Sequence, residues 1–167
     1  MVWLMRVVFA GSFDPPTNGH MDIIIRASKV FESVHVVLAK NIYKESFLSL
    51  EVRQSLLNNL TQDLGLSNVI VVSWDGLIAD YASSNACNAL LRSVRSMYEV
   101  PAEQRMAQMN GRLEDSLETI FMFSKPELSD ISSTAVRELV SWKRLPKNIV
   151  PETVRKELEK RYGPLSQ

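Results

Sequence analysis

Short apolar runs alternate with longer amphipathic stretches along this chain. The β-branched run at 6–10 ends at Gly11 and predicts a buried strand. Apolar residues then recur at helical spacing over 20–31, which predicts a helix. The same alternation predicts strands at 34–39, 69–72, 89–91 and 119–123 and helices at 50–64, 77–84, 98–113, 134–142 and 152–162. Ser49 is a suitable N-cap for the helix that follows it, and Pro101 weakens the start of its own helix.

This order of elements indicates an α/β protein. Strands that alternate with helices form βαβ units, so we expect a Rossmann-like, doubly wound sandwich around a five-stranded parallel sheet. We expect residues 1–167 to form a single domain, with closing helices from about residue 134 and a connector at 146–151. Right-handed crossovers place the carboxyl ends of parallel strands at one edge, where ligands of such sheets bind. A site is therefore expected just beyond the first strand.

The segment from Gly11 to His20 carries the chemistry that suits this position. Glycine permits a close approach of the backbone or a positive φ, and the Ser12 hydroxyl can donate to a phosphate. His20 falls in the first turn of the next helix, where unpaired N–H groups and the helix dipole attract anions. Gly, Pro, Asp and Asn are also ordinary turn residues, and no P-loop spacing is present. The residues alone indicate a phosphate site and leave the reaction open.

Composition changes this picture little. Nineteen basic and nineteen acidic residues give a formal net charge of zero, so binding to nucleic acid is not expected. No run approaches the roughly 18 apolar residues of a membrane span, and the apolar start of the chain lacks the pattern of a signal peptide. We therefore expect a cytoplasmic protein without membrane contact. The single cysteine, Cys87, and His35 in a predicted strand are both expected to be structural.

Five segments together resemble the histidine-x-glycine-histidine class of nucleotidyltransferases, and within it the phosphopantetheine adenylyltransferase family. The first is G-S-F-D-P-P-T-N-G-H at 11–20, similar to that family's G-T-F-D-P-x-T-x-G-H. The others are Tyr43-Lys44 before F-L-S-L-E-V-R at 47–53, L-L-R-S-V-R at 90–95, Glu103 with Met109-Asn110, and S-D-I-S-S-T at 129–134. The likeness spans about residues 6–140, and the ordered set is more specific than any single motif.

The resemblance implies adenylyl transfer from ATP to 4′-phosphopantetheine, giving 3′-dephospho-coenzyme A and pyrophosphate. It implies that His20 stabilises the transition state and that Ser12 contacts phosphates of both substrates. The implied acceptor site comprises Ser12, Lys44, Ile78 and Arg92. The implied ATP site comprises Ser12, Phe13, His20, Ser93, Val94, Arg95, Glu103, Leu128, Ser129, Asp130, Ile131, Ser132, Ser133 and Thr134.

Mg²⁺ is expected to arrive with ATP, because the sequence has no carboxylate cluster for a metal cage. The nearest carboxylate, Asp14, is expected to brace the turn. The family also implies a homohexamer and feedback binding of coenzyme A. The chain departs from the family pattern at four places, with Ser12 in place of threonine, Ser93 in place of glycine, Leu128 in place of an aromatic and Val100-Pro101 in place of an aromatic-acidic pair.

Other readings remain open. Arg92 and Arg95 could pair with acidic neighbours, and the serines and threonine at 132–134 could simply cap the following helix. A related enzyme, acting on nicotinate mononucleotide or on glycerol phosphate, shares the first motif. A non-catalytic nucleotide-binding module would be expected to lack His20 or the phosphate-binding cations, which this chain retains.

Overall fold

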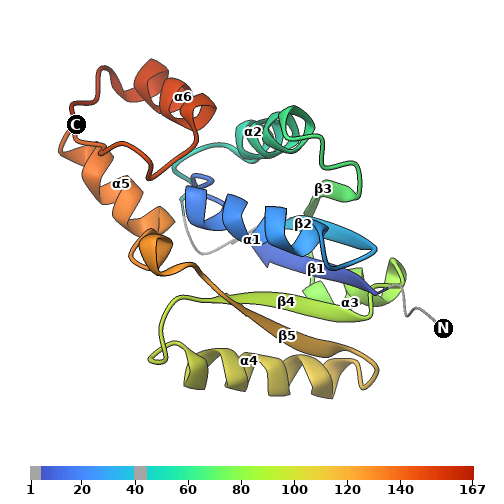
Figure 1. The fold of residues 1–167 in the computed structure, drawn as a ribbon. Coiled ribbons are helices and arrows are strands. Elements are labelled where there is room, and N and C mark those ends of the chain that lie inside the picture. The colour runs from blue at the N-terminus through green and yellow to red at the C-terminus, as the bar shows by residue number, and fades with distance from the viewer. Residues whose placement is uncertain (1–4, 40–44) are drawn as a thin grey trace.

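A computed structural model describes residues 5–39 and 45–167, and within them five parallel strands form one sheet (Figure 1). The strands are β1 (Arg6–Gly11), β2 (Ser33–Ala39), β3 (Val69–Trp74), β4 (Ala89–Val94) and β5 (Glu118–Phe123). Their order in the sheet is β3-β2-β1-β4-β5. The chain winds outward from β1 to β3, crosses to the other side of β1, and winds outward again to β5. The predicted doubly wound α/β fold is confirmed, and its order of strands reverses between β1 and β4.

Helices cover both faces of the sheet, as Figure 1 shows. They are α1 (Asn18–Ser28), α2 (Leu50–Asp63), α3 (Ile78–Ser84), α4 (Val100–Leu113), α5 (Ser133–Ser141) and α6 (Glu152–Tyr162), with a 3₁₀ turn, η1 (Pro126–Leu128). The first two helices lie over one face, and α3 and α4 lie over the other. The last two helices continue the layer of α1 and α2 beyond the end of the strands.

The core is divided by the sheet because successive side chains of a strand point to opposite faces. Val7 and Phe9 of β1 belong to the larger apolar cluster, which gathers side chains from α1, α2, α5 and α6. Val8, between them, belongs to a smaller cluster with α3 and Cys87. The continuous apolar runs predicted as buried strands follow from this burial on both faces.

Several element boundaries differ from the sequence expectation, and three of these differences have a clear physical cause. Helix α1 begins at Asn18 and ends at Ser28, because Thr17 caps its start and the N–H groups of Lys29 and Phe31 close its last turn. Strand β4 runs to Val94 and not to residue 91, because its last three residues pair with β5. Helix α4 begins at Val100, with Pro101 in its first turn, where a missing N–H costs nothing.

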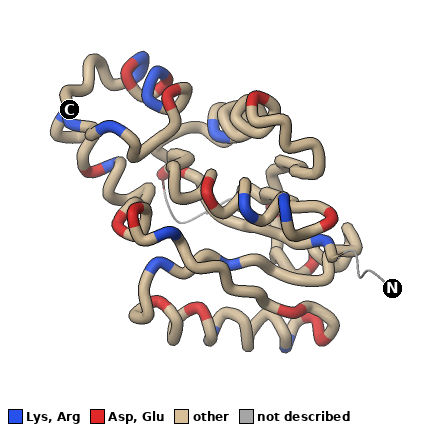
Figure 2. Tube along the Cα trace, viewed as in Figure 1, with Lys and Arg blue, Asp and Glu red and all other residues tan. Residues whose placement is uncertain are grey.

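Charged residues of both signs are interspersed along the trace, in keeping with the net charge of zero (Figure 2). None of the helices within 5–39 and 45–167 has the length and apolar character needed to cross a membrane. The prediction of one domain stays a prediction.

Candidate active site

A cavity of about 820 Å³ opens at the carboxyl ends of β1 and β4. These two strands are neighbours at the point where the strand order reverses, which is where ligands of open α/β sheets bind. The cavity wall comes from the turn after β1 and from the first turns of α1, α4 and α5. The predicted site residues that line it are Ser12, Phe13, His20, Arg92, Ser93, Arg95, Glu103, Ile131, Ser132, Ser133 and Thr134.

The turn after β1 is fixed by a buried aromatic side chain. Phe13 has a φ of 47°, in the left-handed region that non-glycine residues rarely occupy. Its ring packs edge-to-face on Phe9 and on His20, with centroid distances of 5.5 and 5.0 Å. A Cβ atom at Gly11 would lie 3.3 Å from the Phe13 ring. Gly11 therefore favours the close approach of this ring, and it does not adopt a positive φ.

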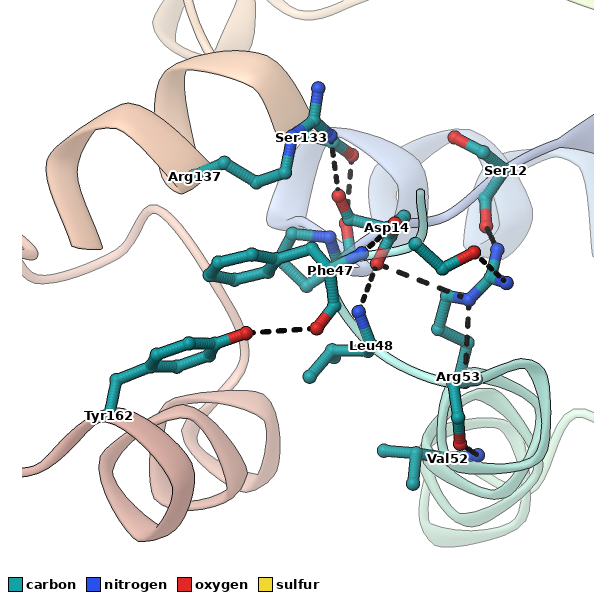
Figure 3. A network of polar contacts seen from close by, with 12 residues as sticks. Ser12, Asp14, Phe47, Leu48, Val52, Arg53, Ser133, Arg137 and Tyr162 are labelled. Carbon is teal, nitrogen blue, oxygen red and sulfur yellow. Dashed lines mark hydrogen bonds and ion pairs between the residues drawn. The ribbon is translucent and has the colours of Figure 1, made fainter. Parts of the chain in front are cut away.

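Asp14 braces the same turn, as the sequence indicated. Its carboxylate accepts hydrogen bonds from the backbone N–H groups of Phe47 and Leu48, at 2.8 Å each (Figure 3). The carboxylate is buried, so these charge-assisted bonds stabilise the anion in place of water. Tyr162 of α6 donates its hydroxyl to the Phe47 carbonyl at 2.9 Å and stacks on the Phe47 ring. The segment after residue 44 is thereby tied both to the turn and to the closing helix.

Two arginines that were not predicted as site residues hold backbone carbonyls of this turn. Arg53 of α2 donates to the Ser12 carbonyl at 2.6 Å, and its buried side chain also reaches Ser46. Arg137 of α5 donates to the Asp14 carbonyl at 2.6 Å and to the Thr134 hydroxyl. Both line the cavity, and Figure 3 shows both side chains beside the turn. Arg53 ends the F-L-S-L-E-V-R segment, which was the one available signal for it; Arg137 had none beyond its place in a helix.

The cap of α1 sets which ring nitrogen of His20 carries the proton. The side chain of Thr17 accepts from the His20 backbone N–H, and the Thr17 backbone N–H donates to His20 Nδ1 at 3.1 Å. The Thr17 hydroxyl also lies 3.0 Å from Nδ1. Because Nδ1 accepts a backbone N–H, the neutral imidazole carries its proton on Nε2. Histidine thus takes the N3 place that glutamate or glutamine usually fills in a capping box.

The surroundings keep this imidazole neutral. Burial, and secondly the positive charge of Arg95, lower the pKa of His20 from 6.5 to about 4. At neutral pH the ring is therefore an uncharged N–H donor in the cavity wall, and not a cation or a ready base. An uncharged donor suits stabilisation of charge that develops on a phosphoryl oxygen.

The two arginines at the end of β4 are each paired with a carboxylate from the start of α4. Arg92 binds Glu103 through Nε–Oε2 at 2.7 Å and Nη2–Oε1 at 3.0 Å. Glu99 accepts the Arg95 backbone N–H at 2.9 Å and also binds its guanidinium. Burial alone would raise the pKa of Glu99, but the hydrogen bonds and charge of Arg95 hold it below its ordinary value. The alternative reading, in which these arginines pair with acidic neighbours, is therefore correct for this structure.

The start of α5 closes another side of the cavity. The Ser132 hydroxyl accepts the Ala135 N–H as an N-cap, so the capping alternative also holds for this residue. Ser133 donates to the Pro15 carbonyl at 2.8 Å and joins α5 to the turn after β1 (Figure 3). The helix start nevertheless lies in the cavity wall, where its N–H groups and dipole can attract phosphate oxygens.

Some predicted residues lie elsewhere. Ile78, at the start of α3, lines a second, more apolar cavity of about 230 Å³. Four others are absent from the described wall of the main cavity: Val94, Leu128, Ser129 and Asp130. Val94 is buried at the end of β4, and the other three lie in or just after η1. Lys44, with Tyr43, lies outside the described residues. His35 and Cys87 are buried, as expected, and His35 is bonded to the Tyr81 hydroxyl.

The structure is a doubly wound α/β protein with a cavity at its topological switch point, and comparison with known families assigns its class. The cytidylyltransferase-like family model matches residues 8–139, so the chain belongs to the cytidylyltransferase-like family. Three curated relatives are named phosphopantetheine adenylyltransferase. They come from Finegoldia magna (37% identical over 95% of this chain and 96% of the relative), Desulforamulus reducens (38%, 95% and 98%) and Clostridium novyi (36%, 95% and 98%). Within the wider family, the chain is a member of the phosphopantetheine adenylyltransferase family.

A solved structure supports the fold independently. A protein of Vibrio parahaemolyticus, described as a putative nicotinate-nucleotide adenylyltransferase, superimposes with a TM-score of 0.64 over 97% of this chain and 98% of that one. The two sequences are 19% identical, so this likeness concerns the fold alone.

Proposed function

We propose that this chain transfers the adenylyl group of ATP to 4′-phosphopantetheine, with 3′-dephospho-coenzyme A and pyrophosphate as products. One observation carries the proposal in the structure: a neutral histidine donor and four guanidinium groups face a single cavity. These groups belong to His20, Arg53, Arg92, Arg95 and Arg137. The choice of 4′-phosphopantetheine as acceptor is based on the names of the relatives that match over 95% of the chain.

The proposed step needs no protein nucleophile. An oxygen of the acceptor phosphate attacks the α-phosphorus of ATP in line, and the bond from that phosphorus to the bridging oxygen breaks as pyrophosphate leaves. Because the attacking phosphate is an anion, no general base is required. The protein's part is to hold the two phosphates in line and to stabilise charge on the α-phosphoryl oxygens. His20 would donate through Nε2, and Ser12 would donate its hydroxyl to phosphates of both substrates.

The acceptor would lie across the two cavities. Arg92 lines both of them, and the smaller cavity is mainly apolar, with Leu77, Ile78, Met106 and Ala107 in its wall. Arg92 would bind the phosphate, and Ile78 would contact the pantetheine arm. Lys44 would be a second cation for the same phosphate. A flexible point charge and a planar fork together suit a dianion.

The nucleotide would occupy the side of the cavity formed by the end of β4 and the start of α5. Ser93 and Arg95 would face the adenosine, and Ser132 and Ser133 would support the β- and γ-phosphates. Val94, Ile131, Thr134 and the segment 128–130 are proposed as the surrounding contacts, with Phe13.

Magnesium would enter with ATP as part of the substrate. Within 5–39 and 45–167, no three His, Cys, Asp or Glu side chains are grouped as metal ligands. Of the four carboxylates that line the cavity in the described residues, those of Asp14, Glu99 and Glu103 are bound to N–H groups or arginines, and Glu45 has no such partner. The residues therefore fit an ion held by phosphate oxygens and water, which would neutralise charge on the triphosphate.

A homohexamer is proposed on the basis of the family resemblance and of one exposed face. Helix α4 has no buried residue, and it packs beside the edge strand β5. Large apolar side chains exposed there are Met106, Met109, Leu113, Phe121 and Phe123. An exposed apolar patch of this kind is typical of contacts between subunits.

We also propose a cytoplasmic location. Coenzyme A contains the product's chemical groups, and we propose that it binds in the main cavity as a feedback inhibitor.

The test is turnover by the purified protein with ATP, Mg²⁺ and one acceptor at a time, followed by pyrophosphate release. We expect turnover with 4′-phosphopantetheine and none with nicotinate mononucleotide or glycerol phosphate. Turnover of nicotinate mononucleotide without turnover of phosphopantetheine would overturn the proposal. Substitution of His20 by alanine is expected to lower kcat by orders of magnitude while ATP still binds.

A further inference from the structure

Arg92 and Glu103 form a paired contact with a defined geometry. Arg92 lies near the end of β4, and Glu103 lies in the first turn of α4. The carboxylate binds one side of the guanidinium, with Nε–Oε2 at 2.7 Å and Nη2–Oε1 at 3.0 Å. The Arg92 side chain is 35% exposed and that of Glu103 is 18% exposed, so the pair is only partly open to solvent. A planar, bidentate contact fixes the plane of the guanidinium as well as its position.

The contact leaves the other side of the guanidinium free. An arginine has five N–H donors, and Glu103 occupies one on Nε and one on Nη2. Both hydrogens of Nη1 and the second hydrogen of Nη2 make no hydrogen bond within 5–39 and 45–167. That free edge belongs to the residue that lines both cavities. A carboxylate and a phosphate can therefore bind the same guanidinium at the same time, each on its own edge.

We propose that Glu103 is a positioning residue that holds the Nε edge of Arg92 and so presents the Nη1–Nη2 edge to the phosphate of the acceptor. This inference rests on the proposed function. It assigns Glu103 a role in acceptor binding, which differs from the contact with adenosine that the sequence resemblance implies. The Arg92 side chain is already ordered before the acceptor arrives, so binding of the acceptor does not have to immobilise a long, flexible side chain.

The neighbouring pair supports the same reading. Glu99 lies four residues before Glu103 and holds Arg95 by its backbone N–H and its guanidinium. Residues four apart lie on the same face of a helix turn. The start of α4 thus supplies one carboxylate to each arginine at the end of β4. Both pairs line the cavity, whereas pairs on an open surface contribute little.

Glu103 could instead compete with the acceptor phosphate for Arg92, and kinetics separate these roles. The variants are Glu103→Gln, which keeps the shape of the side chain, and Glu45→Gln as the control. Glu45 is exposed, lines the same cavity and makes no hydrogen bond or ion pair within the described chain, so its loss removes one negative charge without releasing an arginine. KM for 4′-phosphopantetheine and KM for ATP are measured separately for each protein. Each variant is also unfolded in urea to show that it folds.

We expect E103Q to raise KM for 4′-phosphopantetheine by roughly 2- to 12-fold relative to E45Q, which is the cost of ordering one freed side chain at binding. KM for ATP should stay within twofold of the wild type. In an Arg92→Lys background, the difference between E103Q and E45Q should vanish, because an ammonium group has no plane to orient.

Three results would overturn the inference. A rise in KM for ATP alone would make Glu103 a nucleotide contact. A fall in KM for the acceptor beyond that of E45Q would make it a competitor of the phosphate. An effect of E103Q that persists unchanged in the R92K background would show that it does not act through Arg92. If the wild-type protein fails to turn over phosphopantetheine, the proposed function itself fails and this inference falls with it.

Discussion

The lowered pKa of His20 makes a quantitative prediction about stability in acid. In the folded chain, burial and the charge of Arg95 lower this pKa from 6.5 to about 4. The unfolded chain therefore binds a proton at His20 between these two pH values, and the folded chain does not. Stability then rises with pH across this window and falls as the solution is acidified. Above pH 6.5 the imidazole is neutral in both states, so the contribution of His20 to the free energy of unfolding is fully present and no longer changes with pH.

The magnitude follows from the two pKa values. Their difference corresponds to about 3 kcal/mol of unfolding free energy when the window has been crossed, and to about 2 kcal/mol at pH 5. The hydrogen bond that Nδ1 accepts from the Thr17 backbone N–H also favours the neutral ring, because a protonated ring could no longer accept it. Other groups also titrate here. The pKa of His35 and that of Glu99 are both lowered, so each makes the folded chain less stable in acid.

A matched variant isolates the contribution of His20. Glutamine is a usual N3 residue of a capping box, so His20→Gln should keep the cap of α1 while removing the titration. Urea unfolding of both proteins at pH 7 and pH 5 gives two free-energy losses, and subtraction removes every other group. We expect the wild type to lose about 2 kcal/mol more than the variant. Equal losses in the two proteins would refute a depressed pKa at His20.

Three further predictions concern the network around the turn after β1. Asp14→Asn should lower the unfolding free energy by about 2 kcal/mol. Asparagine is uncharged and has only one acceptor oxygen, so it cannot accept hydrogen bonds from both the Phe47 and the Leu48 N–H groups as the carboxylate does. An unchanged urea midpoint would contradict this. Tyr162→Phe keeps the stacked ring and loses one hydrogen bond, so calorimetry should show a fall of about 1 kcal/mol, or about 2–4 °C in Tm; a loss several times larger would mean that the hydroxyl does more than bond one carbonyl. Arg53→Lys should lower kcat/KM by about tenfold or more because the turn shifts, and wild-type kinetics with this variant would remove Arg53 from the support of the site.

The sequence predicted the fold well because both faces of the sheet are covered. Buried parallel strands appear as continuous apolar runs, and the runs at 6–10 and 34–39 are unmistakable in this respect. Strand β4 was predicted too short because its last residues include Arg92 and Ser93. Backbone pairing with β5 holds them in the strand whatever their side chains, so polar residues concealed half of the strand.

The site was predicted less completely than the fold, for a physical reason. Motifs indicate side chains that contact a ligand. They identified Ser12, His20 and Arg92, which the fold places around one cavity. They do not report side chains that act on backbone carbonyls. Arg53 and Arg137 bind carbonyl groups of the turn after β1, and any segment of the chain offers a carbonyl. Such partners become visible only when the chain is folded.

The arginines of the cavity consequently divide into two kinds. Arg53 and Arg137 bind carbonyls of a turn that is also held by Asp14, so moving either guanidinium would disturb the backbone of the turn itself. Arg92 and Arg95 bind carboxylates at the start of α4, which position their guanidinium groups in the cavity wall. The first kind holds the backbone of the turn in place, and the second presents guanidinium groups to the phosphates. Differences in acceptor preference among related chains should therefore arise at the start of α4 sooner than in the turn after β1.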